Sequence, residues 1–383
     1  MKKAENKLTI GFVLDTTLDV EDGVQQYILV LGDWLKKQGH EVHYIVGETN
    51  RKDIQNLHSL SKNIKVNFNG NKVVMPLPVS TKKIKNFLSK QYFDVLHVQV
   101  PYSPFYGAKF VKHAKKDTVV IGTFHILPFG MVAYVGTWLL GLVLRNNLKR
   151  FNQQISVSTA NQEFSAKTFK TKSIVLPNMV KMDEFKPPSD FVRKNKKIEI
   201  LYLGRLTKRK GCTYLLNAVS RMVKTYPDVQ FNLKIAGKGE QLDKLKKQSK
   251  ILGIDEYIQF LGFVSNEEKV RLMRNADISV FPSYSGECFG IVLIEAISAK
   301  SGVVIGGQNF GYHTVLGEIP ESLVDVKDSY IFSEKLYKFV SDEKFRKSIN
   351  KKQQKIVLQY DYELVGKKVL DVYKNCIITK NKT

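Results

Sequence analysis

Each half of the chain begins with the same pattern of a strand, a loop and a helix. The first copy runs from "LTIGFVLD" (8–15) into "VQQYILVLGDWLKKQGH", and the second runs from "IEILYLGR" (198–205) into "LTKRKGCTYLLNAVSRMVKTYP". Strand-length apolar runs alternate with helical segments between them, which is typical of parallel α/β sheets. A chain of 383 residues is also too long for one ordinary core. We therefore predict an α/β protein with two Rossmann-like domains.

The polar, Pro-containing stretch near 184–197 is the predicted linker. We expect an N-terminal domain at 1–185, a C-terminal domain at 186–358, and a closing helix at 359–383 that packs back toward the N-terminal domain. Further strands are predicted at 41–47, 93–100, 118–124, 154–158, 173–177, 231–237, 258–264, 276–283 and 302–307. Ligands of such sheets bind at the carboxyl ends of the strands, so we predict a site in the cleft between two facing domains.

The chain is strongly basic, with a formal net charge of +24. The excess is spread over both halves, which indicates either a Lys-rich composition or an anionic partner such as a lipid surface, a nucleic acid or a phosphate-bearing substrate. Three cysteines, Cys212, Cys288 and Cys376, have no metal-type spacing and cannot all pair, as is usual in a reducing cytoplasm. The N-terminal apolar run is only as long as a strand, so a signal peptide is not expected.

The segment "ADISVFPSYSGECFGIVLIEAISAKSGVVIGG" has the most specific pattern. A strand leads through a loop with Glu287 and Phe289-Gly290 into a helix, whose free N–H groups and dipole favour an anion. Glu295 lies about two turns inside that helix, so the two carboxylates suit two parts of one elongated ligand better than one metal ion. The alternative is a loop acid and a solvated helix face. The residues around Glu295 are apolar, however, and a buried carboxylate needs a partner.

Three other strand ends carry candidate groups. In "LGRLTKRKG", Arg205 ends a strand and Lys208, Arg209 and Lys210 precede a helix, where cations can clamp phosphates or form a solvated turn. "AGKGE" (236–240) is a Gly-rich strand-to-helix loop. His125 ends the strand in "GTFH", at the predicted cleft.

Taken together, these segments resemble the retaining glycosyltransferases of the GT-B fold, in the large family-4 group. The resemblance covers almost the whole chain, and "PSYSGECFGIVLIEA" is similar to the family's E-x7-E signature. The part "DVLHVQVPYSPF…GTFH" looks most like the phosphatidylinositol mannosyltransferases and diacylglycerol glucosyltransferases. The resemblance implies a hexosyltransferase that uses a UDP- or GDP-sugar, with two facing Rossmann-like domains.

The resemblance also implies roles for residues of the donor site. Arg205 and Lys210 would hold the donor diphosphate, and the amides near Phe289 and Gly290 would add donors. Glu287 would contact hydroxyls of the transferred sugar.

Three further roles follow from the same resemblance. Glu295 would contact the ribose, His125 would position the sugar or stabilise developing charge, and Gly23 would let backbone approach the phosphates and the acceptor. No carboxylate nucleophile is evident, so same-face attack by the acceptor hydroxyl is favoured over double displacement. Because Arg and Lys supply the charge of the clamp, neither a metal nor another cofactor is required.

Several positions depart from the family pattern. Asp22 precedes Gly23 where a Gly-Gly pair is common, and Met179 and Lys181 replace a usual Gly and Asp. Lys300 stands where Gly is common, and His313 where an acid is frequent. These departures leave the identity of the donor sugar open.

The stretch "GTFHILPFGMVAYVGTWLLGLVLRNNLKR" (122–150) has no charged residue between Ile126 and Leu144. Pro128 and Gly130 interrupt it, and the remaining helix from Met131 to Leu144 would be about 21 Å long, short of the roughly 30 Å core of a bilayer. We predict a buried helix or an apolar wall beside the acceptor site, and favour the wall.

A second membrane signal is the basic amphipathic segment 80–93, which is equally typical of an ordinary surface helix. We therefore expect a lipid acceptor and a peripheral location on the cytoplasmic face of the membrane. A soluble glycan acceptor is the alternative. A nucleotide-sugar epimerase and a nucleic-acid-binding protein are rivals, although no nucleic-acid-binding module is recognisable.

Overall fold

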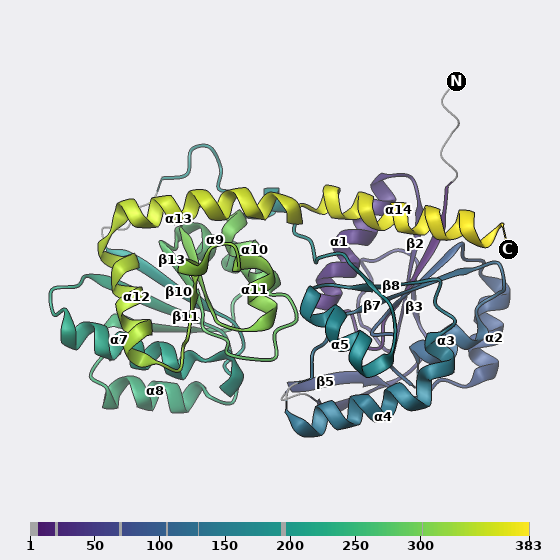
Figure 1. Ribbon diagram of the computed structural model, residues 1–383, viewed down its shortest axis with the longest axis horizontal. Coiled ribbons are helices and arrows are strands. Elements are labelled where there is room, and N and C mark those ends of the chain that lie inside the picture. Colours follow the sequence, from purple (N-terminus) through teal and green to yellow (C-terminus); the bar gives the residue numbers. More distant parts are fainter. Residues whose placement is uncertain are drawn as a thin grey trace. The chain divides into compact units, whose positions relative to one another are not determined.

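The computed structural model describes residues 7–19, 22–68, 71–104, 106–128, 130–192, 197–300 and 302–382. The chain forms two compact units (Figure 1). The N-terminal unit contains Met1–Met179 and Tyr362–Thr383, and the C-terminal unit contains Val180–Asp361. The division after residue 179 lies six residues before the predicted domain boundary, and the last helix belongs to the N-terminal unit.

The N-terminal unit is built on a parallel sheet in the order β3-β2-β1-β6-β7-β8-β9. Its strands are β1 (Thr9–Val13), β2 (Glu41–Val46), β3 (Leu57–Ser59), β6 (Val95–Gln99), β7 (Val119–Phe124), β8 (Gln153–Ser156) and β9 (Ile174–Val175). An antiparallel hairpin of β4 (Asn63–Phe68) and β5 (Asn71–Pro76) is separate from this sheet. Strand order reverses between β1 and β6, as in Rossmann-like folds.

Helices cover both faces of this sheet (Figure 1). They are α1 (Gly23–Lys37), α2 (Thr81–Lys90), α3 (Gly107–His113), α4 (Met131–Leu148), α5 (Thr159–Phe169) and α14 (Tyr362–Lys380). Helix α14 packs beside α1, and its Tyr373 hydroxyl lies 2.6 Å from Nδ1 of the buried His97 on β6. These contacts attach the C-terminal helix to the core of the N-terminal unit.

The C-terminal unit has a parallel sheet in the order β12-β11-β10-β13-β14-β15. Its strands are β10 (Ile198–Leu203), β11 (Phe231–Ala236), β12 (Ile258–Gly262), β13 (Ile278–Phe281), β14 (Val303–Gly307) and β15 (Leu323–Val324). Its α-helices are α6 (Met182–Phe185), α7 (Cys212–Thr225), α8 (Leu242–Ile251), α9 (Asn266–Asn275), α10 (Ile291–Ser298), α11 (Phe310–Leu316), α12 (Ser329–Ser341) and α13 (Glu343–Ile356). Short 3-10 helices are η1 (Lys208–Lys210), η2 (Asp255–Tyr257), η3 (Pro320–Ser322) and η4 (Val357–Tyr360).

Every predicted strand is present, and most are shorter by one to a few residues. The structure adds β3, β15 and the β4–β5 hairpin. Segment 80–93 contains α2, which is an ordinary surface helix of the domain. Its Ile84 and Leu88 are buried in the core, and Phe87 packs against that core. Among the described residues, no helix combines the length and the apolar character needed to cross a membrane.

Candidate active site

The C-terminal unit brings two loops together at the carboxyl ends of β10 and β13. These strands are neighbours at the point where the strand order reverses. Strand β10 leads into η1 and α7, and β13 leads through residues 282–290 into α10. Open α/β sheets bind their ligands at this position.

Gly211 allows the two loops to approach closely. Its φ is 73°, and a Cβ there would lie 1.9 Å from the carbonyl oxygen of Pro282. Any residue with a side chain would therefore be strained and would push the loops apart. The amide of Tyr284 also donates a hydrogen bond to the carbonyl of Arg209 at 3.2 Å. The basic residues of η1 are thereby held beside the loop that carries Glu287.

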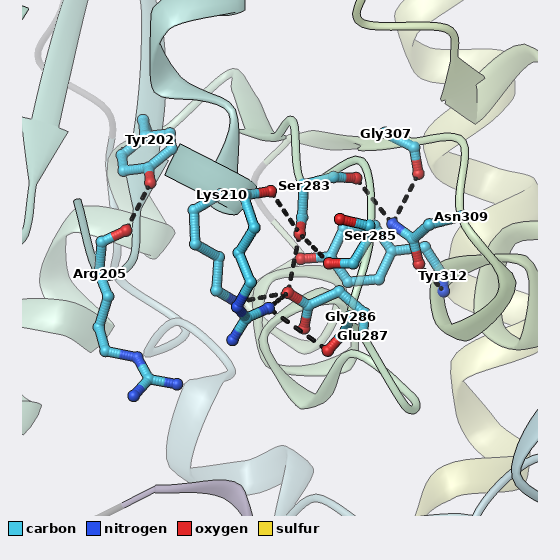
Figure 2. A network of polar contacts seen from close by, with 11 residues as sticks. Tyr202, Arg205, Lys210, Ser283, Ser285, Gly286, Glu287, Gly307, Asn309 and Tyr312 are labelled. Carbon is cyan, nitrogen blue, oxygen red and sulfur yellow. Dashed lines mark hydrogen bonds and ion pairs between the residues drawn. The ribbon is translucent and has the colours of Figure 1, made fainter. Parts of the chain in front are cut away.

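The carboxylate of Glu287 is the centre of this cluster (Figure 2). Its Oε1 lies 2.7 Å from an Nη of Arg209, 2.9 Å from Nζ of Lys210 and 2.8 Å from Oγ of Ser283. The side chains of Arg209 and Glu287 are 8% and 12% exposed. Within the described part of the chain all three contacts go to the same oxygen, so Oε2 keeps its lone pairs for hydroxyl donors.

These contacts set the ionisation state of the cluster. Burial would raise the pKa of Glu287, but the charges of Lys210 and Arg209, together with hydrogen bonds from Lys210 and Ser283, lower it to about 2. Burial lowers the pKa of Lys210, while Glu287 opposes this shift. An ionised Glu287 can accept hydrogen bonds from sugar hydroxyls at neutral pH. Lys210 has three N–H donors and spends one on Glu287.

A second layer of hydrogen bonds holds the loop that carries Glu287. The side-chain amide of Asn309 donates to the carbonyls of Ser283 and Gly307, at 2.7 and 3.1 Å. Its Oδ1 accepts from the amide of Tyr312 at 3.0 Å and caps α11. Ser283 is thus fixed both through its backbone and through its contact with Glu287.

The other predicted donor residues surround this cluster. Arg205 lies on the loop after β10, and Figure 2 shows its side chain apart from the cluster around Glu287. Gly290 caps α10 with a φ of 102°, where a Cβ would lie 2.7 Å from the ring of Tyr312. Phe289 is buried against Tyr360. The loop that carries Glu287 thus leads directly into the start of α10.

Glu295 has a different partner. It is 6% exposed, and its Oε1 lies 2.9 Å from Nζ of Lys269 on α9. The ammonium of Lys269 also stands 5.4 Å from the ring centre of Phe185 on α6. The buried carboxylate thus has the partner that its apolar surroundings require, and among the described residues this contact leaves Oε2 for another ligand.

The remaining predicted residues lie in the N-terminal unit. His125 follows β7, is 8% exposed, and places Nε2 2.7 Å from Oε1 of Gln99. The Gln99 amide nitrogen donates to the carbonyl of His97 at 3.3 Å, which turns Oε1 toward His125. Nε2 therefore carries the proton, and Nδ1 is an acceptor. Burial lowers the pKa of His125 to about 3, so this imidazole is neutral at pH 7.

Gly23 is the first residue of α1 and is exposed. The first turn of α1 has no acidic side chain, and its N-cap Asp22 makes no side-chain cap. The free backbone N–H groups at the start of α1 therefore suit an anion.

Asp15 lies on the loop that precedes α1, and its Oδ1 accepts a hydrogen bond from the amide of Gly107 at 3.0 Å. Burial raises the pKa of Asp15 to about 8.

Sequence reasoning did not assign roles to several of these residues. Arg209 was one of three cations in a basic run, and only the fold shows that it reaches Glu287. Lys269 reads as an ordinary residue of a polar helix, and Gln99 as the end of a strand. Of the charged residues predicted for the donor site, the structure brings Lys210 and Glu287 into contact. Glu295 instead pairs with Lys269.

Comparison with known proteins identifies the two parts of the chain. The model of Glycosyltransferase Family 4 matches residues 22–184, and that of Glycosyl transferases group 1 matches residues 184–356. A phosphatidyl-myo-inositol mannosyltransferase from Mycolicibacterium smegmatis is 27% identical over 96% of this chain and 94% of its own length. A D-inositol 3-phosphate glycosyltransferase from Corynebacterium jeikeium is 32% identical over 45% of this chain and 44% of its own.

Solved structures share the whole architecture. A glycosyltransferase from Rickettsia africae superimposes with a TM-score of 0.77 at 19% identity, covering 97% of this chain and 99% of that one. HepE from Anabaena, solved with UDP and glucose, gives 0.71 at 14% identity, covering 96% and 100%. The fold is therefore that of a GT-B glycosyltransferase, as the sequence predicted.

The two family models together span residues 22–356. The chain thus belongs to the glycosyltransferases that pair a Family 4 domain with a group 1 domain. The prediction of a hexosyltransferase is confirmed by these domains and by the names of the relatives.

Proposed function

We propose that the protein is a retaining glycosyltransferase that moves a hexose from a UDP- or GDP-sugar to a hydroxyl of a membrane lipid of the diacylglycerol or phosphatidylinositol type. The observation that carries this proposal is the Glu287 cluster. One oxygen of the carboxylate is fixed by three donors and the other is left for a ligand, beside an excess of positive charge.

The cluster supplies what departure of a nucleoside diphosphate requires. Arg205 and Lys210 hold the diphosphate and stabilise its charge as the bond to the sugar breaks, which is where preorganised electrostatics act most strongly. Backbone amides near Phe289 and Gly290 add donors. Oε2 of Glu287 binds hydroxyls of the transferred sugar. These groups provide the charge themselves, so the proposed reaction uses no metal ion.

The acceptor hydroxyl attacks C1 on the face that the diphosphate leaves. The C1–O bond to the phosphate breaks, a C1–O bond to the acceptor forms, and the hydroxyl proton departs with the nucleoside diphosphate. His125 positions the sugar through its unprotonated Nδ1. Because this imidazole is neutral, it does not supply a positive charge. Gly23 offers backbone donors at the start of α1, and Glu295 binds the ribose.

The lipid acceptor is supported by relatives that cover nearly the whole chain. These relatives are the phosphatidyl-myo-inositol mannosyltransferases of Mycolicibacterium smegmatis and Mycobacterium tuberculosis. The HepE structures, which contain UDP or UDP-glucose, support a nucleotide-sugar donor. A lipid acceptor implies work at a membrane surface, and we propose a peripheral location on its cytoplasmic face.

The test is transfer of labelled hexose from a panel of UDP- and GDP-sugars, with and without lipid vesicles. Label in the organic phase is the expected result. Transfer only to a soluble glycan would refute the lipid acceptor and keep the glycosyltransferase. Conversion of the nucleotide sugar without any acceptor would instead indicate an epimerase.

The donor site is tested in the same assay. Glu287→Gln and Arg205→Ala should each abolish transfer while the protein stays folded, as checked by circular dichroism at the assay temperature. Full activity in either variant would refute the role given to that residue. The anomeric configuration of the product, measured by NMR, should match that of the donor.

A further inference from the structure

Helix α4 exposes an unusually apolar surface. The exposed large apolar side chains among its described residues are Met131, Tyr134, Val135, Trp138, Leu139, Leu142 and Val143, and each is between 45% and 78% exposed. Their spacing of three and four residues places them on a continuous side of the helix. We call these seven residues the α4 apolar face. Figure 1 shows α4 at the periphery of the N-terminal unit.

A narrow stripe on the opposite side attaches α4 to the domain. Thr137, Gly141, Leu144 and Leu148 are buried along this stripe. The two leucines belong to a small aromatic cluster with Phe124, Phe164 and Phe169, among others. The core thus uses about one residue per turn of α4 and leaves the α4 apolar face to solvent. Contiguous exposed apolar surface of this kind marks a binding site for a protein or a membrane.

A basic pocket adjoins the C-terminal end of the helix. It has a volume of about 390 Å³ and lies between the ends of α4 and α5. Its cationic lining residues are Arg145, Lys149, Lys170 and Lys172, and the described residues around it include no carboxylate. Arg145 and Lys149 continue the helical spacing of Trp138 and Leu142, so apolar and cationic groups share one side of α4.

We propose that the α4 apolar face and this basic pocket together form the surface by which the protein docks on an anionic bilayer. The apolar side chains enter the interface beneath the headgroups, and the pocket binds the phosphate of an anionic lipid. This inference deepens the proposed function and takes its partner from the lipid acceptor proposed there. It names a surface and a lipid charge that the proposed chemistry does not require.

Charge complementarity favours a bilayer over a second copy of the chain. Two α4 helices packed face to face would bring their own Arg145 and Lys149 groups into one assembly, with no carboxylate on either helix to balance them. Tyr134 and Trp138 also have the amphipathic rings that are enriched at membrane interfaces. Helix α2 lacks this combination, because its apolar residues Ile84 and Leu88 are buried.

Vesicle flotation tests the proposal with the full chain. Large unilamellar vesicles of phosphatidylglycerol and phosphatidylcholine are compared with vesicles of phosphatidylcholine alone. Binding should require the anionic lipid and weaken with salt. Leu139→Gln with Val143→Gln should lower the apparent affinity about tenfold or more, because both side chains leave the apolar interface. These residues are 51% and 78% exposed, so the fold is retained.

The pocket is tested separately. Lys149→Gln with Lys172→Gln should lower affinity for anionic vesicles by about 25-fold, since each cation near an anionic surface contributes about fivefold. The matched control is Lys246→Gln with Lys247→Gln on α8, which removes the same charge from exposed positions. Equal losses in the two pairs would overturn the pocket. The same binding is also measured with added inorganic phosphate. If phosphate at equal concentration binds the pocket as tightly as the anionic vesicles do, the pocket is a site for a soluble anion, and its role in docking is overturned.

Tryptophan fluorescence reports the insertion directly. The chain has two tryptophans, of which Trp34 is buried and Trp138 is 45% exposed. In a Trp34→Phe variant, emission of Trp138 should shift to the blue with anionic vesicles. No shift, or a dimer in solution that Leu139→Gln disrupts without any vesicle binding, would overturn the docking surface. Transfer to a detergent-dispersed lipid tests the proposed function independently of this result.

Discussion

Replacement of Arg209 by methionine tests whether this residue acts through Glu287. Oε1 of Glu287 has three donors, at 2.7, 2.8 and 2.9 Å, and Arg209 makes the shortest contact. A hydrogen bond to a charged group contributes about 1.5–3 kcal/mol. Loss of about 2 kcal/mol of positioning corresponds to about a 30-fold decrease in kcat/KM. We expect this decrease for Arg209→Met, with the donor KM less affected than kcat.

The assay is a double-mutant cycle with Glu287→Gln. Variants that show no transfer at the ordinary enzyme concentration are measured at a much higher one, where a residual rate below the ordinary detection limit can be compared. Once the carboxylate is gone, Arg209→Met should have little further effect, so the coupling should be about 2 kcal/mol. Arg221→Met on α7 is the control, because it removes an exposed cation from a nearby helix. Equal effects of Arg209→Met in both backgrounds would show that Arg209 contacts the substrate itself and would refute the reasoning.

Other predictions concern stability and the second carboxylate. His97→Gln should make the free energy of unfolding depend less on pH in the acid range. Burial, with His125 nearby, lowers the pKa of His97 to about 3. The folded state therefore loses no stability through this group above pH 6.5, and loses it progressively as pH falls below that value. By pH 5 the loss is about 2 kcal/mol, and a wild-type minus variant difference independent of pH would contradict this. Asp15→Asn should stabilise the fold more at pH 8 than at pH 5 in urea titrations, because the raised pKa of Asp15 disfavours the folded state as pH rises above about 4. Lys269→Met should raise the donor KM about tenfold by leaving Glu295 unpartnered, and an unchanged KM would separate Glu295 from donor binding. EDTA should leave the transfer rate unchanged, and a loss restored by Mg²⁺ would refute the metal-free clamp.

The fold could be predicted from the sequence because most of its apolar runs have the length and the neighbours of a buried strand. Strands such as β1 and β10 are nearly continuous apolar segments followed by helical patterns, which parallel sheets require. The β4–β5 hairpin was missed, although its connecting Asn69-Gly70 dipeptide is a recognised hairpin signal in a sequence. Segment 131–144 was predicted to be a short helix, and α4 extends four residues further.

The site could be predicted only in part, for a physical reason. Glu287 and Lys210 lie in recognisable strand-end loops, so their general location followed from the pattern of the chain. The partners of the two glutamates depend on how helices pack around the sheet. The pairing of Arg209 with Glu287 and of Lys269 with Glu295 therefore follows only from the packing of η1 and α9 against their neighbours. The ionisation state of His125 likewise depends on its burial and on the orientation of Gln99.

The most direct test of the central claim compares wild type with Glu287→Gln in one transfer assay. Hexose label from a nucleotide sugar is followed into the organic phase in the presence of lipid vesicles. The account predicts lipid-linked label for the wild type and none for Glu287→Gln, with both proteins equally folded. Equal labelling by the two proteins would contradict the role of the Glu287 cluster in sugar transfer.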